Sequence, residues 1–213
     1  MRLVKMSFLV FVVGILATIP QAQARPRIWW VATGTGGAPS IRLEGTSYPR
    51  TNLLGGGGGI LLEHGTKTTR LEYGLIASEF GYHTDFNATA GSTDSDHFVW
   101  RLNVPMTAKF QLGKALHFQV GGAYSAWVGQ VRDFDPSGAK TYSSLASQGL
   151  KDGTWSALVG LGFSRPLRGK GQYRVDFRYM HALSEQLTSD YRSAHSDSSL
   201  FAHEFSVLIG VGF

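Results

Sequence analysis

The residue types that could catalyse a reaction lie closest together at His181, Ser184 and Glu185. In hydrolases a serine attacks, a histidine takes its proton and a carboxylate orients the histidine. Successive residues of a β-strand point to opposite faces, so a separation of three places His181 and Ser184 on opposite faces. The set could act together only if the strand ends by Ala182. We therefore expect His181 to lie at the rim of a sheet, beside a loop.

Two other groups of polar residues could bind or react, and neither has the spacing of a known site. His83 and Asp85 stand at the border of a strand and a loop, without a serine in a matching motif. Asp190, His195 and Asp197 carry metal-ligating side chains, but their spacing matches no known metal loop. We expect both groups to be solvated loop residues. The sequence thus predicts no catalytic residue, no metal ion and no cofactor.

The composition indicates a β-rich chain with tight turns. Of the 213 residues 27 are glycine, 12% are aromatic, only 16% are charged and none is cysteine. Soluble domains usually contain about 25% charged residues and ~7% glycine. Without cysteine there is no disulfide framework and no thiolate metal site. The glycine-rich TGTGG of residues 33–37 lacks the lysine and hydroxyl residue of a P-loop, which excludes that nucleotide site.

Residues 1–24 have the layout of a secretory signal peptide. Arg2 and Lys5 form a basic start, an apolar stretch follows, and residues 22–24 form a cleavage site of the A-x-A type. The apolar stretch is shorter than the ~20 residues that a membrane-spanning helix needs, which argues against a helical anchor. The mature domain is then residues 25–213. It keeps only a small excess of basic residues, so we expect no nucleic-acid partner.

Alternation of apolar and polar residues marks the strand-forming segments. In residues 98–112 the even positions are all apolar and the odd positions are mostly polar, which is the period of a strand. Five other segments alternate in the same way, and two weaker ones complete a set of eight. We interpret the glycine run 55–59 as a strand rather than a flexible loop. Near Glu79 and Phe80, where the phase slips, the pattern indicates a bulge or the membrane rim. The eight segments are residues 28–34, 52–64, 70–77, 98–112, 116–128, 155–164, 172–179 and 205–213.

The connections between these segments alternate in length. Outer-membrane barrels have an even number of strands, short periplasmic turns and long outer loops. The sequence therefore predicts an all-β fold, an eight-stranded antiparallel up-and-down transmembrane β-barrel with both termini in the periplasm. A short helix over the mouth of the barrel is possible within the loop 133–152. The short connections are 64–67, 113–115 and 166–171, and the long ones are 35–51, 84–97, 133–152 and 184–200.

Alternation alone does not separate a membrane barrel from a soluble periplasmic barrel or sandwich, whose apolar face points inward. Aromatic residues near the strand ends favour the membrane, because such residues form interfacial girdles. We therefore expect a monomer in the outer membrane of a Gram-negative bacterium, surrounded by outer-membrane lipids and lipopolysaccharide. The expected girdle residues are Trp29, Trp30, Tyr73, Phe98, Trp100, Trp155, Tyr173 and Phe213.

The polar face of the strands predicts what fills the barrel. An eight-stranded barrel is just wide enough for its own side chains, and an unpaired buried charge is very costly. We therefore expect an ion-paired network of five cationic and three acidic residues that plugs the lumen. The eight residues are Arg70, Glu72, Arg101, Lys109, Arg174, Asp176, Arg178 and Glu204. The excess of cations leaves a narrow anion pore as an alternative.

Several stretches of the sequence resemble known outer-membrane features. The C-terminal FSVLIGVGF looks like the terminal strand signal that the barrel-assembly machinery of Gram-negative bacteria reads. The order and spacing of LNVPMTAKFQLG, LHFQVGGAYSAWVG, WSALVGLGF and QYRVDFRYMHAL are similar to the PorT-like outer-membrane β-barrel family, over residues 28–213. The resemblance implies an eight-stranded barrel that meets periplasmic chaperones and the assembly machinery, while most members have no defined activity. The signal residues are Phe205, Val207, Ile209, Val211 and Phe213.

Three functions remain open on these grounds. The first is a non-enzymatic barrel with a structural, envelope-integrity or surface-binding role. The second is a lipid A-modifying enzyme of the deacylase kind, built around His181. The third is a narrow passive pore. We predict the first, because the spacing of the hydrolase residues fails and long arginine side chains would fill the bore.

Overall fold

A computed structural model describes most of residues 26–213. The described residues are 26–37, 40–43, 46–47, 53–88, 91–134, 137–144, 150–169, 171–194, 199–201 and 203–213. The expected signal peptide, residues 1–24, lies outside these residues.

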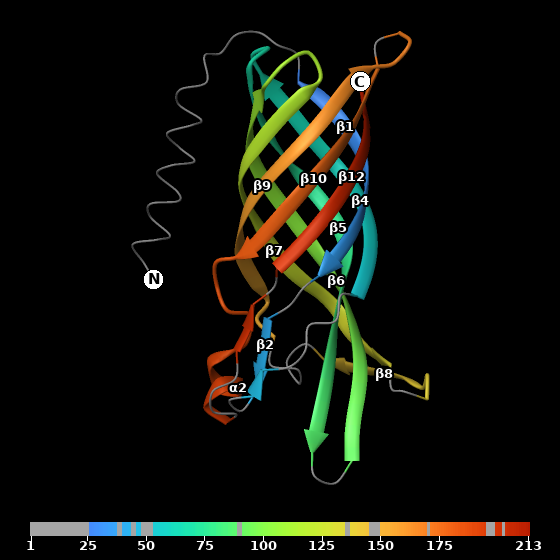
Figure 1. Cartoon of the computed structure of the whole chain (residues 1–213), viewed down its shortest axis with the longest axis vertical. Coiled ribbons are helices and arrows are strands. Elements are labelled where there is room, and N and C mark those ends of the chain that lie inside the picture. Colours follow the sequence, from blue (N-terminus) through green and yellow to red (C-terminus); the bar gives the residue numbers. More distant parts are fainter. Residues whose placement is uncertain are drawn as a thin grey trace.

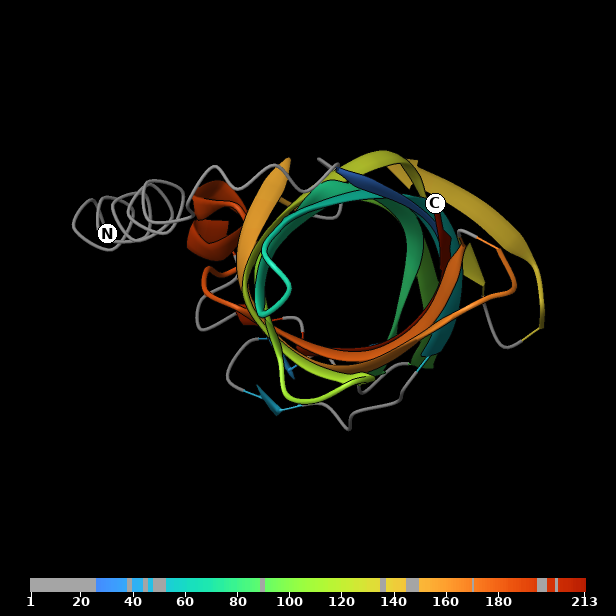
Figure 2. The same ribbon diagram turned by 90° about the horizontal axis from the view of Figure 1, so that it is seen from above.

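Eight strands form a closed barrel (Figures 1 and 2). Each strand pairs antiparallel with its neighbours in the sheet, and the pairing of β6 with β7 closes the ring. The expected fold, an eight-stranded antiparallel up-and-down barrel, is thereby confirmed. In ring order the strands are β1 (Arg27–Gly37), β4 (Leu53–Gly65), β5 (Thr69–Ala88), β6 (Gly91–Gln111), β7 (Leu116–Phe134), β9 (Gly153–Pro166), β10 (Gln172–Ala182) and β12 (His203–Gly212).

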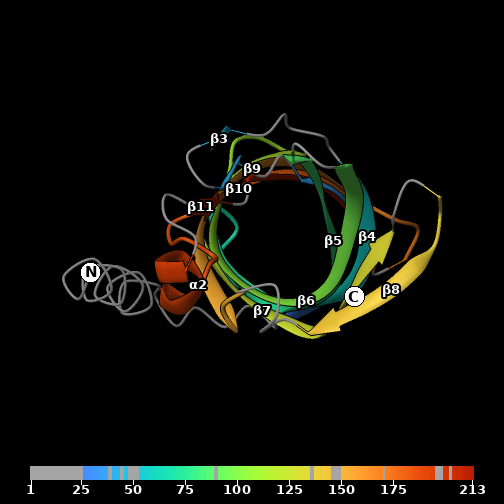
Figure 3. The same cartoon turned by 90° about the horizontal axis from the view of Figure 1, so that it is seen from below.

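The short turns lie at one end of the barrel and the smaller elements at the other (Figures 1 and 3). At the short-turn end the backbones of Ile28 and Phe213 are hydrogen-bonded, so both ends of the barrel chain meet there. We call the opposite end the loop end. Its smaller elements are β2 (Ser40–Leu43), β3 (Thr46–Ser47), β8 (Lys140–Ser144), α2 (Ser189–Ala194) and β11 (Ser199–Phe201). No helix in the described part of the chain is long and apolar enough to cross a membrane.

Two connections expected to be loops contain regular structure. The segment 84–97 continues β5 and β6 as one long hairpin, with Ala88 paired to Gly91. In the segment 133–152, Lys140–Ser144 forms β8 and pairs with the end of β7, where a short helix was expected to begin. Residues 145–149 of that segment lie outside the described residues. The hairpins extend because each backbone N–H and C=O of the ladder gains a partner on the next strand.

The bulge expected near Glu79 lies elsewhere. The register of β5 with β6 is the same from Tyr73 to Ala88, so β5 has no slip at Glu79. The irregularity is instead in the pairing of β6 with β7, where Gly129 adopts a φ of 83° that favours glycine. Phe80 faces inward like Ile76 and Ser78 on the same strand, and its side chain is buried. The sequence pattern changed there because an aromatic residue enters the lumen, while the backbone phase stays the same.

The glycine run 55–59 is part of β4, as expected. It pairs with β1 on one side and with β5 on the other. A Cβ atom on Gly57 would lie 2.0 Å from the carbonyl oxygen of Ala77 on β5. Only glycine therefore permits the close approach of β4 and β5 at this point.

The outer face of the barrel wall is apolar and the inner face is largely polar. The side chains of Phe177 and Ile209, for example, are 61% and 58% exposed on the outer face. Other large apolar residues exposed on the barrel strands include Trp30, Ile60, Leu75, Trp100, Val104, Trp155, Leu161 and Phe205. Trp29 does not join the expected girdle, because its side chain points inward and is only 1% exposed.

Candidate functional site

The lumen is the place where the chain concentrates its charged side chains, and Glu72 lies at the centre of its short-turn half. Glu72 on β5 is fully buried. It accepts hydrogen bonds from Arg174 and from Arg178 Nη2, the latter at 2.6 Å, and Lys109 Nζ lies 2.9 Å from Oε2. Three cations thus converge on one carboxylate that water does not reach. Such a cluster is stable only because every charge has a partner.

Asp176 is the second acid of this half and joins the same cations. Its Oδ2 accepts from Arg178 at 3.0 Å, and its Oδ1 lies 2.9 Å from His117 Nε2. Both carboxylates therefore share Arg178. The sharing holds β5 and β10 against each other across the lumen.

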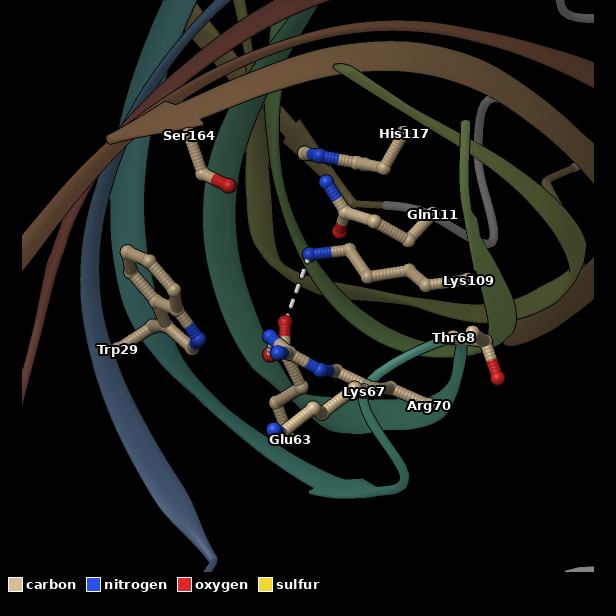
Figure 4. Close-up of a pocket in the computed structure, with 9 residues that line it drawn as sticks. All are labelled: Trp29, Glu63, Lys67, Thr68, Arg70, Lys109, Gln111, His117 and Ser164. Carbon is tan, nitrogen blue, oxygen red and sulfur yellow. Dashed lines mark hydrogen bonds and ion pairs between the residues drawn. The ribbon is translucent and has the colours of Figure 1, made fainter. Parts of the chain in front are cut away.

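Glu63 adds a fourth acid to the network, and it was absent from the eight expected residues. Lys109 Nζ donates to Glu63 Oε2 at 2.9 Å, and Arg70 Nη1 donates to Oε1 at 2.6 Å. Figure 4 shows Glu63 close to both cations at the short-turn end. In the sheet register Glu63 on β4 stands directly opposite Glu72 on β5, so both side chains lie on the inner face. Knowledge of this register would have identified Glu63 as a lumen residue.

The ring of Trp29 faces two cations of this ion-pair network, Arg174 and Lys109. The guanidinium carbon of Arg174 is 4.4 Å from the centre of the Trp29 ring, and Lys109 Nζ is 5.8 Å from it. A cation over the face of a tryptophan is attracted by the ring quadrupole, more strongly where water is excluded. This contact explains why a residue expected in the girdle is buried in the lumen.

An apolar layer separates the two halves of the lumen. Val31, Leu61, Ile76 and Leu208 are buried together with Trp29. A second small group, Ala123, Leu158 and Met180, is buried in the same way. The barrel is thus filled across its width by side chains of both kinds.

Arg101 and Glu204 form the ion pair of the loop-end half. Both side chains are buried. The guanidinium of Arg101 also lies over the rings of Phe80, at 5.2 Å, and Trp127, at 5.7 Å. The pair is therefore enclosed by aromatic rings rather than by water.

Two small cavities lie in the described part of the lumen. One, at the short-turn end, has a volume of about 10 Å³ and is lined by Trp29, Glu63, Arg70 and Lys109 among others (Figure 4). The other, beside the apolar layer, has a volume of about 20 Å³. A buried water needs roughly 10–15 Å³. Each cavity therefore has room for about one water.

All eight residues expected in the lumen take part in ion pairs. Seven of them are buried, and Arg70 is partly exposed at the short-turn rim. Sequence reasoning missed Glu63, and it left His117 out of the paired residues although its place on the inner face was visible. The five residues of the C-terminal signal, Phe205, Val207, Ile209, Val211 and Phe213, are all exposed on the outer face.

The described contacts do not join the three candidate hydrolase residues, His181, Ser184 and Glu185. His181 faces outward at the end of β10, with its Nδ1 atom 3.0 Å from Nδ1 of His203. Ser184 follows the end of β10 at Ala182. The main-chain oxygen of Glu185 accepts a hydrogen bond from Lys151 Nζ.

A different set of His, Asp and Ser occurs at the loop end, and sequence reasoning missed it. Asp133 Oδ1 lies 2.5 Å from His97 Nδ1, and Asp133 Oδ2 accepts from Ser143 Oγ at 2.6 Å. The aspartate lies between the other two residues. In a nucleophilic triad the histidine must contact the serine, so this arrangement ties β8 to the barrel and is not that of a triad.

Of the other candidate residues, the structure describes the side chain of Asp190. Asp190 Oδ1 accepts a hydrogen bond from Ser189. His195 and Asp197, and the side chains of His83 and Asp85, lie outside the described residues. Within the described ranges, no three or more His, Cys, Asp or Glu residues are grouped so as to hold a metal ion.

No family model matches the chain, and no curated protein gives a significant match. The resemblance to the PorT-like family therefore stays a prediction.

Among solved structures, the chain is similar to three barrel proteins at low identity. Ail, the attachment invasion locus protein of Yersinia pestis in complex with the heparin analogue sucrose octasulfate, is 12% identical, with 89% of this chain and 100% of that chain covered and a TM-score of 0.42. Neisserial surface protein A is 12% identical, with coverages of 87% and 97% and a TM-score of 0.45. The outer membrane protease OmpT of Escherichia coli is 10% identical, with coverages of 90% and 97% and a TM-score of 0.43. Similarity at this level carries no argument about function.

Proposed function

We propose that the chain is an integral outer-membrane β-barrel of a Gram-negative bacterium, with a structural, envelope-integrity or surface-binding role and no catalysis. The observation that carries this proposal is the polarity of the wall. Phe177 and Ile209 face outward, while Glu72, Arg174 and Asp176 are fully buried inside. A soluble barrel has the reverse arrangement, because water favours charge outside and apolar groups inside.

Closure of the barrel is a second feature that suits a lipid environment. A closed barrel satisfies every backbone donor and acceptor between its strands, which is required where no water is present. The apolar outer face then lies against acyl chains, and lipids and lipopolysaccharide surround a monomer. The orientation that we propose puts the short turns and both ends of the barrel chain in the periplasm.

The lumen supports a plugged barrel rather than a pore. Ion pairs, an apolar layer and the Arg101–Glu204 pair follow one another along the bore. Two cavities in the described part of the interior hold about one water each, which is too little space for a hydrated ion.

The elements at the loop end would carry the surface-binding role. The β5–β6 hairpin, β8, α2 and the small sheet of β2, β3 and β11 lie there (Figures 1 and 3). Loops on a rigid scaffold commonly carry binding function. Their serine, threonine, aspartate and tyrosine content suits polar partners such as lipopolysaccharide sugars. The exposed face of β12 is the surface offered to the barrel-assembly machinery, after transport by periplasmic chaperones.

Fractionation of cells that express the full chain tests the location. We expect the mature protein in the outer-membrane fraction after a carbonate wash, with a folded band that shifts on boiling. A protein that remains monodisperse in a periplasmic extract without detergent would overturn the proposal.

Two further measurements test the closed lumen and the absence of catalysis. Purified protein in planar bilayers should produce no single-channel steps, and regular steps would favour the passive pore. Lipid A from cells with and without the protein should have the same mass spectrum. A change in that spectrum would favour the lipid A-modifying enzyme.

A further inference from the structure

Two histidines and a tyrosine converge on the outer face of the barrel, close to the loop end. Tyr179 and His181 lie on β10, and His203 lies on β12. His181 and His203 are directly opposite each other in the register of the two antiparallel strands. Side chains of directly opposite residues lie on the same face and within reach of each other. These three side chains are called the rim cluster below.

The polar atoms of the rim cluster point at one another. Nδ1 of His181 lies 3.0 Å from Nδ1 of His203, and the hydroxyl of Tyr179 lies 3.1 Å from that same His203 nitrogen. An imidazole nitrogen carries either one proton or one lone pair. His203 Nδ1 therefore cannot make two full hydrogen bonds to these neighbours at once. A shared cation would satisfy all three atoms together.

We propose that the rim cluster binds a divalent copper or nickel ion, with Nδ1 of His181, Nδ1 of His203 and the oxygen of Tyr179 as ligands. Metal–imidazole bonds are about 2.0–2.1 Å long, so nitrogens 3.0 Å apart subtend an angle of about 90° at a shared metal. The 3.1 Å separation of the tyrosine oxygen from His203 Nδ1 corresponds to a similar angle. Right angles between nitrogen and oxygen ligands are typical of tetragonal copper(II) and nickel(II), whereas zinc prefers the wider tetrahedral angle.

The surroundings hold the ligands in place and leave space for water. The rings of Tyr179 and His203 are stacked within 5° of parallel, and Phe205 packs against Tyr179 at 4.8 Å between ring centres. Fixed rings lower the entropy that is lost when a ligand is bound. His181 is exposed, so water can occupy the remaining coordination positions.

Copper binding to the refolded full-length mature chain, prepared without a polyhistidine tag, tests the site. Isothermal titration with Cu²⁺ in detergent measures affinity, and electron paramagnetic resonance reports nitrogen ligands. We expect one tight site per chain with nitrogen hyperfine structure. The variants His181→Asn and His203→Asn should each weaken binding about tenfold or more, and Tyr179→Phe should weaken it less. The boiling shift of each variant shows that its barrel is folded.

His64→Asn is the matched control. His64 is also beside a tyrosine, Tyr73, at 5.7 Å between ring centres, but the described contacts of that pair are ring contacts. We expect this variant to bind Cu²⁺ like the unchanged protein. Equal affinity of the unchanged protein and the His181→Asn/His203→Asn double variant, or the absence of nitrogen coupling that depends on these residues, would overturn the site. Tighter binding of Zn²⁺ than of Cu²⁺ and Ni²⁺ would overturn the proposed coordination.

Discussion

Arg101 and Glu204 form an ion pair between strands on opposite sides of the barrel. β6, which carries Arg101, is four strands from β12, which carries Glu204, in either direction around the ring. Arg174 on β10 and Glu72 on β5 are related in the same way, nearer the short-turn end. Arg178 on β10 pairs with Glu72 as well, so ion pairs connect opposite walls on both sides of the apolar layer.

Arg101→Leu should lower the thermal stability of the barrel. The change leaves Glu204 buried without its counter-charge, and breaking a buried pair in this way costs about 3–5 kcal/mol. We expect the folded band to convert to the unfolded band at a clearly lower temperature on a gel. The double variant Arg101→Leu/Glu204→Leu should recover much of the loss, because no unpaired charge remains. Arg168→Leu, in an exposed turn, is the control, and equal behaviour of Arg101→Leu and this control would refute an ion-paired interior.

Glu72→Gln should destabilise the barrel more than Glu204→Gln. Both changes keep the shape of the side chain, but Glu72 neutralises Lys109, Arg174 and Arg178, whereas Glu204 pairs with Arg101. Urea unfolding followed by tryptophan fluorescence gives the two losses of unfolding free energy. A smaller loss for Glu72→Gln would mean that the three cations find other partners.

Gly57→Ala should impair folding, and Gly34→Ala should not. The Cβ atom on residue 57 would lie 2.0 Å from a carbonyl oxygen of β5, whereas at residue 34 it would meet no atom within 4 Å. Overpacking of this kind costs about 1–3 kcal/mol, and here the obstacle is rigid backbone. Refolding yield and urea midpoint measure the difference. Similar values for the two variants would show that β4 can move away from β5.

An epitope inserted at the tip of the β5–β6 hairpin, between Ala88 and Gly91, should be accessible to antibody on whole cells. The same epitope in the short turn 66–68 should become accessible only after the outer membrane is opened. The hairpin projects from the loop end and the turn lies at the other end (Figure 1). Labelling of the turn, but not of the hairpin, on intact cells would invert the proposed orientation.

Much of the barrel could be predicted from the two-residue alternation of apolar and polar side chains along the sequence. Alternation assigned the inner and outer faces of residues 98–112 and 205–213 correctly, because a strand alternates its side chains whatever its surroundings. It also placed Arg174, Asp176 and Arg178 on one face, which the structure shows to be the inner one.

Other features were not visible because they depend on neighbours distant in the sequence. Glu63 follows a glycine run without alternating polarity, so only its register opposite Glu72 reveals its direction. Trp29 and Trp30 are adjacent on β1 and therefore face opposite sides, but that Trp29 is the inward one depends on its contact with Arg174, which is far away along the chain. The rim cluster depends on the register of β10 with β12, which no local pattern encodes.

The cross-barrel ion pairs join early strands to the last two strands of the ring. Along the chain, Arg101 on β6 precedes its partner Glu204 on β12, and Glu72 finds Lys109 on β6 but its two arginines only on β10. The Arg101–Glu204 pair therefore forms only when β12 completes the ring. A chain truncated before Gln172 would leave Arg101 without its counter-charge, and Glu72 with one of its three cations, in an open sheet that lipid does not tolerate.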